Sequence, residues 1–262
     1  MTITHRNNTL LVVIGVLLVL LVFLALAPYI LYKTGEIESI SLAYKKLCTP
    51  NYIFGFLLVL FSVISLFILR LFFYKTNSVE IFFFMIYLVS LIFESSRPLI
   101  LVCQELNLPF VYMMFLSRAA YFSKICAVFA LFISALSSSD IGINKFNTIV
   151  IIIVVFSFMF SSAIPLSDYT LDNGYYMPGF FTYYLFTLLF IEFLTVLIFV
   201  INYFQKRNNE YFYMALSAMF IAVGREISFY MISIEYFSIG MAFMIGGTIL
   251  FSSKLHEIYR WY

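Results

Sequence analysis

The stretch LLVVIGVLLVLLVFLALAPYILY, residues Leu10–Tyr32, contains no charged residue. As a helix that rises about 1.5 Å per residue, it is long enough to cross the roughly 30 Å hydrocarbon layer of a bilayer. Arg6 precedes it and Ala25-Leu26-Ala27 resembles a signal-peptidase site, so a cleaved signal peptide is one reading. The length of the run, and the presence of Pro28 directly after that site, favour a retained signal-anchor helix.

Seven further apolar runs follow along the chain. They cover residues 51–73, 78–102, 109–136, 146–165, 179–203, 210–233 and 236–253. Because they are long and unbroken rather than alternating segments of about 10 residues, they predict helices and not barrel strands. We therefore expect an all-α polytopic membrane bundle of about eight transmembrane helices. It comprises a tail and signal anchor in 1–32, a short outer loop in 33–50 and a seven-helix bundle in 51–262.

The composition of the chain excludes a water-soluble domain. Hydrophobic residues make up 64% of the sequence and charged residues 11%, whereas a soluble domain carries about 25% charged residues. So few charges cannot cover a water-facing surface. The loops are too short for a soluble catalytic domain, and no basic run exists that would bind nucleic acid.

Lysine and arginine in the loops indicate orientation, because cytoplasmic loops carry an excess of these residues. With the N-terminus inside, the cytoplasmic side holds Arg6, Arg70, Lys75, Lys145, Lys206, Arg207, Lys254 and Arg260. The outer side holds Lys33, Lys45 and Lys46. This asymmetry predicts that both termini lie in the cytoplasm, and we expect the chain in a bacterial cytoplasmic membrane.

Catalytic and metal-binding motifs are missing from the sequence. The chain has two histidines, His5 and His256, both near its ends, so a zinc ligand set is not expected. Neither GxSxG nor HExxH is present, and the aspartates fall in predicted loops. We expect no metal and no cofactor, and an enzyme acting on lipid is the least favoured function.

Seven charged residues fall inside the predicted spans, where each costs at least ~2.5 kcal/mol near mid-bilayer on the insertion scale. Counted from the outer helix ends, five lie roughly 8–14 Å deep: Glu94, Arg97, Arg118, Arg225 and Glu226. Lys124 and Glu192 lie deeper, at roughly 20–23 Å. Intramembrane charges of this kind hold a bundle together, bind a ligand, or line an ion or proton path.

These depths predict partners. We expect the five shallower residues to meet inside the outer half of the bundle, with Glu94 beside Arg118 and Glu226 beside one of the other arginines. Lys124 and Glu192 form a second candidate pair. The shallower group has three cations and two anions, so its spare cation is a candidate contact for a small anionic ligand.

The cysteines, prolines and glycines suggest further local features. Cys48 and Cys103 both fall on the outer side, where they are either a disulfide or two idle thiols. Pro98 is expected to loosen the third helix near its outer end. Gly240 and the pair Gly246-Gly247 favour close helix contact in the last helix. No internal repeat is apparent, which weakens a transporter reading.

Two stretches resemble a known family. The segment NYIFGFLLVLFSVISLFILRLFFYKTNSVEIFFFMIYLVS (51–90), with its Phe54-Gly55 step and its Tyr74-Lys75 turn, resembles the opening helix pair of bacterial seven-transmembrane receptors with diverse intracellular signalling modules. The segment FSIGMAFMIGGTILFSSKLHEIYRWY (237–262) is similar to their last helix, with Ile239-Gly240 near its start and Ser252-Ser253-Lys254 at its exit.

The resemblance implies a sensory function. Those receptors carry an outer sensor domain and an intracellular output module, and this sequence contains neither. We therefore expect a sensor-like bundle that signals through a cytoplasmic partner protein. A small-solute or ion transporter is the alternative, and a membrane enzyme acting on lipid is the second alternative.

Overall fold

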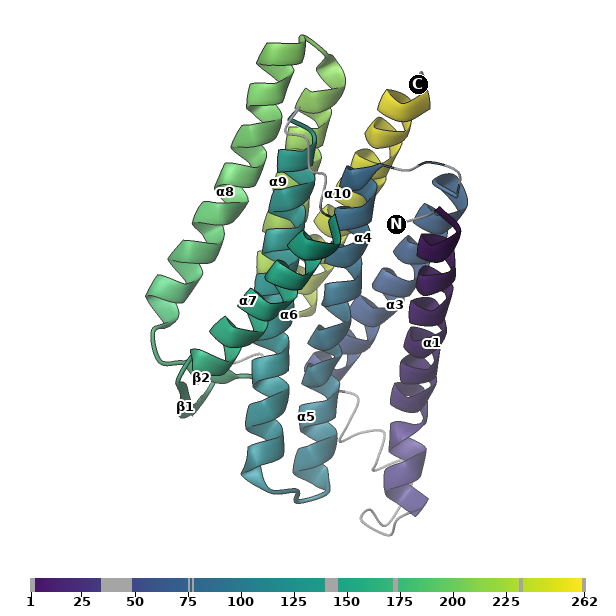
Figure 1. The fold of residues 1–262 in the computed structure, drawn as a ribbon. Helices are drawn as coiled ribbons and strands as arrows, with labels where there is room; N and C mark the ends of the chain where they lie inside the picture. Colours follow the sequence, from purple (N-terminus) through teal and green to yellow (C-terminus); the bar gives the residue numbers. More distant parts are fainter. Residues whose placement is uncertain are drawn as a thin grey trace.

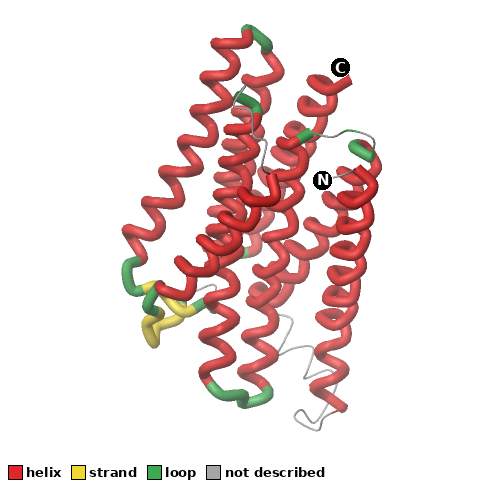
Figure 2. The backbone as a smooth tube through the Cα atoms, in the orientation of Figure 1, coloured by secondary structure: helices red, strands yellow, loops and turns green. Residues whose placement is uncertain are grey.

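The computed structural model describes residues 3–33, 49–74, 76, 78–139, 146–171, 174–230 and 233–260, and most of the predicted outer loop 33–50 lies outside this part of the chain. The described residues form a bundle of long helices with one small hairpin (Figures 1 and 2). The helices are α1 (Ile3–Lys33), α3 (Pro50–Phe72), α4 (Val79–Ser90), α5 (Ser96–Glu105), α6 (Phe110–Ser137), α7 (Phe146–Ala163), α8 (Phe181–Lys206), α9 (Asn209–Tyr230) and α10 (Ile234–Arg260). The strands are β1 (Leu166–Thr170) and β2 (Tyr176–Pro178).

Within the described residues, seven helical segments are long and apolar enough to cross a membrane, and one of them, Val79–Glu105, joins α4 and α5 through a 3-10 turn, η1 (Leu91–Ser95). The eighth apolar helix, α7, is shorter. The prediction of an all-α polytopic bundle is therefore confirmed. Helix α10 continues seven residues past its predicted end at residue 253, because hydropathy marks the apolar part of a helix and not its polar last turns.

Both ends of the described chain lie where α3 ends. The Arg6 guanidinium of α1 donates hydrogen bonds to the backbone carbonyls of Phe73 and Thr76, and the His256 ring of α10 meets the Phe72 ring edge-on at 6.2 Å. The turn between α5 and α6 lies at the opposite end of the bundle (Figure 1). The two termini therefore share one side of the membrane, and which side that is stays a prediction from loop charge.

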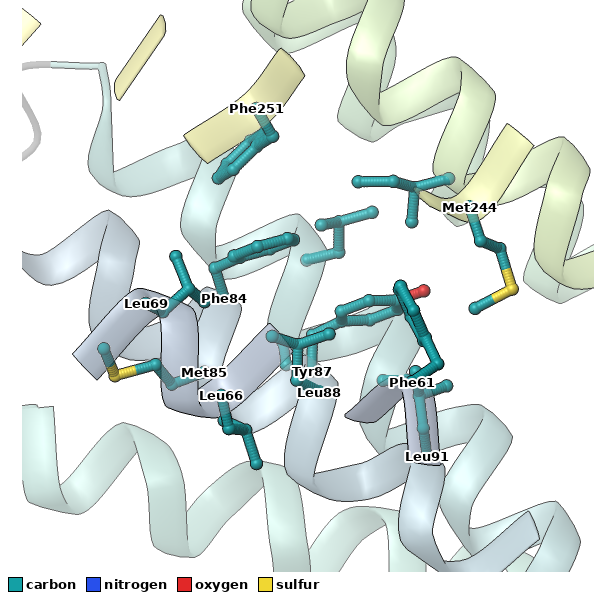
Figure 3. Close-up of a cluster of buried hydrophobic side chains, with 14 of the residues drawn as sticks. Phe61, Leu66, Leu69, Phe84, Met85, Tyr87, Leu88, Leu91, Met244 and Phe251 are labelled. Carbon is teal, nitrogen blue, oxygen red and sulfur yellow. The ribbon is translucent and has the colours of Figure 1, made fainter. Parts of the chain in front are cut away.

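The largest apolar cluster packs α3 and α4 against α9 and α10. Figure 3 shows Phe84 beside Phe251, whose ring centroids are 4.4 Å apart, and Tyr87 beside Leu88. Helices α9 and α10 approach closely at Gly240, which has no side chain. Any side chain there would meet the backbone of Gly224. Small residues permit this approach between membrane helices.

The third crossing changes from α-helix to 3-10 helix over η1. Pro98 has no backbone N–H, and its ring crowds the carbonyl of the residue four positions earlier, which is Glu94. The predicted loosening of this helix therefore coincides with the turn before Pro98. The Pro98 ring packs against Gly55 of α3, where any side chain would clash with it.

A two-stranded antiparallel hairpin connects α7 to α8, which the sequence analysis did not predict. Its register pairs Leu166 with Pro178 and Thr170 with Tyr176. The turn passes through Gly174 at φ +84°, a left-handed conformation that glycine adopts without strain. The hairpin lies at the end of the bundle opposite the termini (Figure 1) and places Tyr175 and Tyr176 against the helices.

Candidate functional site

A buried ion pair joins the broken third crossing to α9. Arg225 Nη2 lies 3.3 Å from Glu94 Oε1, and both side chains are at most 2% exposed. Arg225 Nη1 also donates a 3.2 Å hydrogen bond to the backbone carbonyl of Lys124 on α6. One guanidinium therefore connects three crossings, and its planar geometry is well suited to several acceptors at once.

A second ion pair lies beside the first. Lys124 Nζ is 2.8 Å from Glu226 Oε2, and the lysine side chain is fully buried. The ammonium also lies 4.0 Å from the centroid of the Tyr230 ring and 4.5 Å from that of Phe229. Such cation–π contacts are worth about 2 kcal/mol when desolvated. We call Glu94, Lys124, Arg225 and Glu226 the inner charge cluster.

Arg97 lies next to this cluster without an acidic partner among the described residues. Its side chain is 1% exposed, and Nη2 donates a 2.9 Å hydrogen bond to the Phe229 carbonyl. The guanidinium carbon lies 5.3 Å from the centroid of the Tyr175 ring and 5.9 Å from that of Phe229. Arg97 Nε and Nη1 are buried and have no hydrogen-bond partner in the described structure. Arg97 is therefore a fully buried cation with unused donors beside the inner charge cluster.

The hairpin reaches this site through Tyr175. Its hydroxyl donates a 3.0 Å hydrogen bond to the backbone carbonyl of Glu94, the same carbonyl that Pro98 excludes from the helical ladder. Burial raises the pKa of the Tyr175 phenol, so the hydroxyl stays protonated and remains a donor. The Tyr121 hydroxyl of α6 donates a 2.8 Å hydrogen bond to the Tyr176 carbonyl and so holds strand β2 against α6.

Two of the predicted charges take other positions. Glu192 of α8 is buried within electrostatic reach of Lys124, Arg225 and Glu226, but it makes no ion pair or hydrogen bond with a described residue. Arg118 is half-buried on α6, and its Nε has no hydrogen-bond partner in the described part of the chain.

The predicted partners are therefore wrong in three respects, since Glu226 also forms its ion pair with a lysine and not with one of the arginines. Glu94 pairs with Arg225 and not with Arg118, and Lys124 pairs with Glu226 and not with Glu192. The counted depths assumed that all outer helix ends are level, but the α5–α6 turn extends well beyond the start of α8 (Figure 1). Lys124 is therefore far from the outer end of its own helix, α6, and yet its ammonium lies level with Glu226 of α9.

The aromatic residues of the site were missed by the sequence analysis. Tyr175 follows the predicted turn 172–174, and Phe229 lies one helical turn beyond Arg225 on the same helix face. The position of Phe229 relative to Arg225 was a usable signal. Nothing in the sequence singled out Tyr175 as a site residue, because tyrosines after a loop are common at a membrane boundary.

Several polar atoms around the cluster are buried without a hydrogen-bond partner in the described structure. Besides those of Arg97, they include Arg225 Nε, Glu226 Oε1 and the Tyr87 hydroxyl. Orphaned groups of this kind mark strain or a functional role. Neither of the two described cavities borders them.

No metal or disulfide centre is formed by the described residues. Among them, no group of three His, Cys, Asp or Glu side chains could hold a metal ion. Cys103 and Cys126 are free thiols, whereas Cys48 lies outside the described residues. Comparisons of the chain with protein families, with curated proteins and with solved structures found no match. Fold and site together define a polytopic helical membrane protein with a buried ion-pair network capped by a hairpin.

Proposed function

We propose that this protein is a membrane sensor in which the hairpin controls the inner charge cluster and a cytoplasmic partner reads the result. The observation that carries this proposal is the hydrogen bond from Tyr175 to the Glu94 carbonyl. It links the surface at one end of the bundle directly to the buried pair Glu94–Arg225. We place the protein in a bacterial cytoplasmic membrane with both termini inside, as the loop charges predict.

The 3-10 turn η1 supplies a two-state element. A short 3-10 segment inside a helix often marks a functional hinge. When the Tyr175 hydroxyl leaves, the Glu94 carbonyl loses its side-chain donor and keeps the Ser96 N–H, and the loss of one such hydrogen bond costs about 0.5–1.5 kcal/mol. A free energy of about 1 kcal/mol changes the population ratio of two helix conformations by about fivefold.

The same rigid helices extend to the other end of the bundle. Helix α4 carries Glu80, which accepts a 2.6 Å hydrogen bond from the Tyr259 hydroxyl of α10. Helix α9 carries Glu210 in its first turn, and this carboxylate pairs with Lys254 of α10 at 3.1 Å. A rotation of α4 or α9 at the cluster would therefore alter contacts beside the chain ends, where a partner protein would bind.

Arg97 is the contact that we propose for a small anionic ligand. It is a fully buried cation beside the inner charge cluster that has no acidic partner among the described residues, and its guanidinium lies against Tyr175. A carboxylate or phosphate would accept hydrogen bonds from the N–H groups of Nε or Nη1 that have no partner in the described structure. To reach them it would have to move the Tyr175 ring, so ligand entry and hairpin movement would be one event.

The test measures distances at the end of the bundle near the termini. Nitroxide labels on Ser137→Cys and Ser253→Cys, in a chain with Cys48, Cys103 and Cys126 replaced by serine, report the separation of α6 and α10 in nanodiscs. Tyr175→Phe, which removes the hydroxyl, is expected to shift or broaden the distance distribution. Tyr169→Phe is the matched control, because Tyr169 lies in the same hairpin with 79% of its surface exposed.

Equal distributions in Tyr175→Phe and the unsubstituted chain would contradict the sensor proposal. A transporter would then be the better reading, because broken helices beside buried charges are typical of transporter sites. Proteoliposomes with a trapped pH dye and an imposed potassium potential test for proton movement. Flux that Glu226→Gln abolishes would favour the transporter. An enzyme acting on lipid is the third candidate, and no observation in the described structure favours it.

A further inference from the structure

A groove of 590 Å³ opens between α3 and α10, in the half of the bundle nearest the chain ends. Its α3 wall is apolar except for Ser65 and includes Leu57, Leu60, Ile64 and Ile68. Met241 and Ile245 continue this apolar lining on α10. The groove is separate from the inner charge cluster, and none of the residues proposed above as the sensory site lines it.

Apart from Ile249, the rest of the α10 wall is polar. Thr248, Ser252 and His256 line the groove at intervals of four residues, which places them on one helix face about 6 Å apart. Thr248 is 6% exposed, and its Oγ1 has no hydrogen-bond partner in the described structure. The groove is therefore polar over about 12 Å from the end of the bundle and apolar beyond that.

A cation without an acidic partner among the described residues lies beside the polar end of the groove, in an adjoining cavity. A second cavity, of 480 Å³, is lined by Arg70, Tyr74 and Thr76 and shares Phe72 with the groove. Arg70 has no acidic partner among the described residues, and its Nε is buried without a hydrogen bond. Lys254, by contrast, is paired with two carboxylates, Glu257 at 2.7 Å and Glu210 at 3.1 Å, and Glu257 also lines the groove.

We propose that this groove binds one glycerophospholipid with an anionic headgroup. The phosphate lies between Arg70 and His256, because Arg70 offers unused charged donors there. The ester carbonyls lie deeper in the groove, where one of them accepts a hydrogen bond from the unpartnered Thr248 hydroxyl, whereas the Ser252 hydroxyl already donates to the Thr248 backbone carbonyl. One acyl chain continues along the apolar wall toward Leu57 and Met241.

The row of polar residues on α10, Thr248, Ser252 and His256, is the reason to expect a lipid in the groove and not a helix from a second copy of the chain. A neighbouring transmembrane helix would lay apolar side chains against Thr248 and leave its buried hydroxyl without a partner. A buried unsatisfied hydroxyl costs about 1–3 kcal/mol, whereas an ester carbonyl satisfies it. The lipid therefore matches both the apolar and the polar wall.

The test is native mass spectrometry of the full chain in detergent, titrated with phosphatidylglycerol or with phosphatidylcholine of identical acyl chains. One phosphatidylglycerol is expected to bind at least tenfold more tightly than phosphatidylcholine. Arg70→Gln should remove this preference but keep chain binding. Equal affinity of the unsubstituted protein for the two lipids would overturn the proposal.

A groove-filling variant tests the location. Ile245→Trp places a large ring in the groove and is expected to lower the affinity for phosphatidylglycerol at least tenfold. Val19→Trp is the matched control, because Val19 lies on α1 and is 70% exposed outside the groove. Unchanged affinity for phosphatidylglycerol in Ile245→Trp would overturn the assignment of the lipid to this groove. The assignment would also be overturned if the unsubstituted protein were a dimer and Ile245→Trp made it monomeric without loss of lipid binding.

A spectroscopic measurement covers the case in which Ile245→Trp does not fold. In Ile64→Trp combined with Trp261→Phe, the single tryptophan lies at the groove, since Ile64 lines it and is 49% exposed. Brominated phosphatidylglycerol, diluted into phosphatidylcholine nanodiscs, should quench its fluorescence more than equally dilute brominated phosphatidylcholine. Equal quenching by the two lipids would show bulk bilayer contact and overturn the proposal.

Discussion

Arg225 Nη2 lies 3.3 Å from Glu94 Oε1, at the point where the third crossing changes from α-helix to 3-10 helix. Two exceptions to the rules of membrane helices therefore coincide: buried charges and a broken hydrogen-bond ladder. The pair fixes η1 against α9, and the Tyr175 hydroxyl fixes the Glu94 carbonyl from the other side. The same residue is thus held through its carboxylate by a helix and through its backbone by the hairpin.

The first prediction concerns this pair. Arg225→Leu should lower the free energy of unfolding by about 3–5 kcal/mol, because it leaves the Glu94 carboxylate buried without a counter-charge. Adding Glu94→Gln to Arg225→Leu should recover part of that loss. The free energies are measured by denaturant unfolding in mixed micelles. A double variant that is less stable than either single variant would argue against the pair.

The second prediction separates the two candidate partners of Lys124. A double-mutant cycle with Lys124→Met and Glu226→Gln should give a coupling energy of about 1–3 kcal/mol, because the two groups are 2.8 Å apart. The matched cycle with Glu192→Gln should give a smaller value, since Glu192 makes no direct contact with the lysine in the described structure. A larger coupling to Glu192 would restore the pairing expected from the sequence.

The third prediction concerns the α9–α10 interface. Gly240→Ala should destabilise the protein by about 1–3 kcal/mol, because its new methyl group would lie 2.8 Å from the Gly224 carbonyl oxygen and 3.0 Å from the Ser228 nitrogen. Gly246→Ala is the control, since nothing lies within 4 Å of its new methyl group. Thermal unfolding in detergent compares them, and equal melting temperatures would contradict the close packing.

The fourth prediction concerns topology. Lys254 and Glu210 form an ion pair, so the α8–α9 turn lies at the same end as the α10 C-terminus. A fluorescent reporter inserted after Asn208 or fused to the C-terminus should fluoresce in the cytoplasm. Alkaline phosphatase inserted at Asn107, at the opposite end, should be active outside. The reverse pattern would leave the bundle intact and invert its orientation.

The charged residues of the site could be found in the sequence, but their partners could not. Charges inside apolar runs stand out, because each one is costly in lipid. Pairing depends on the rotation of each helix and on the height of its ends, and neither is encoded in the spacing along one helix. Lys124 shows this directly, since its counted depth matched Glu192 although its ammonium lies against Glu226.

The sequence by itself determined that this protein is a helical membrane bundle, because a run such as Leu10–Tyr32 has one stable arrangement in a bilayer: a helix that satisfies its own backbone groups. The same logic located the other spans and the charges within them. Only the tertiary structure decided that Arg225 holds Glu94 and that Tyr175 caps the Glu94 carbonyl. Those contacts join segments more than 80 residues apart, and they depend on helix tilt, rotation and the fold of a connecting loop, which packing sets for the whole bundle at once.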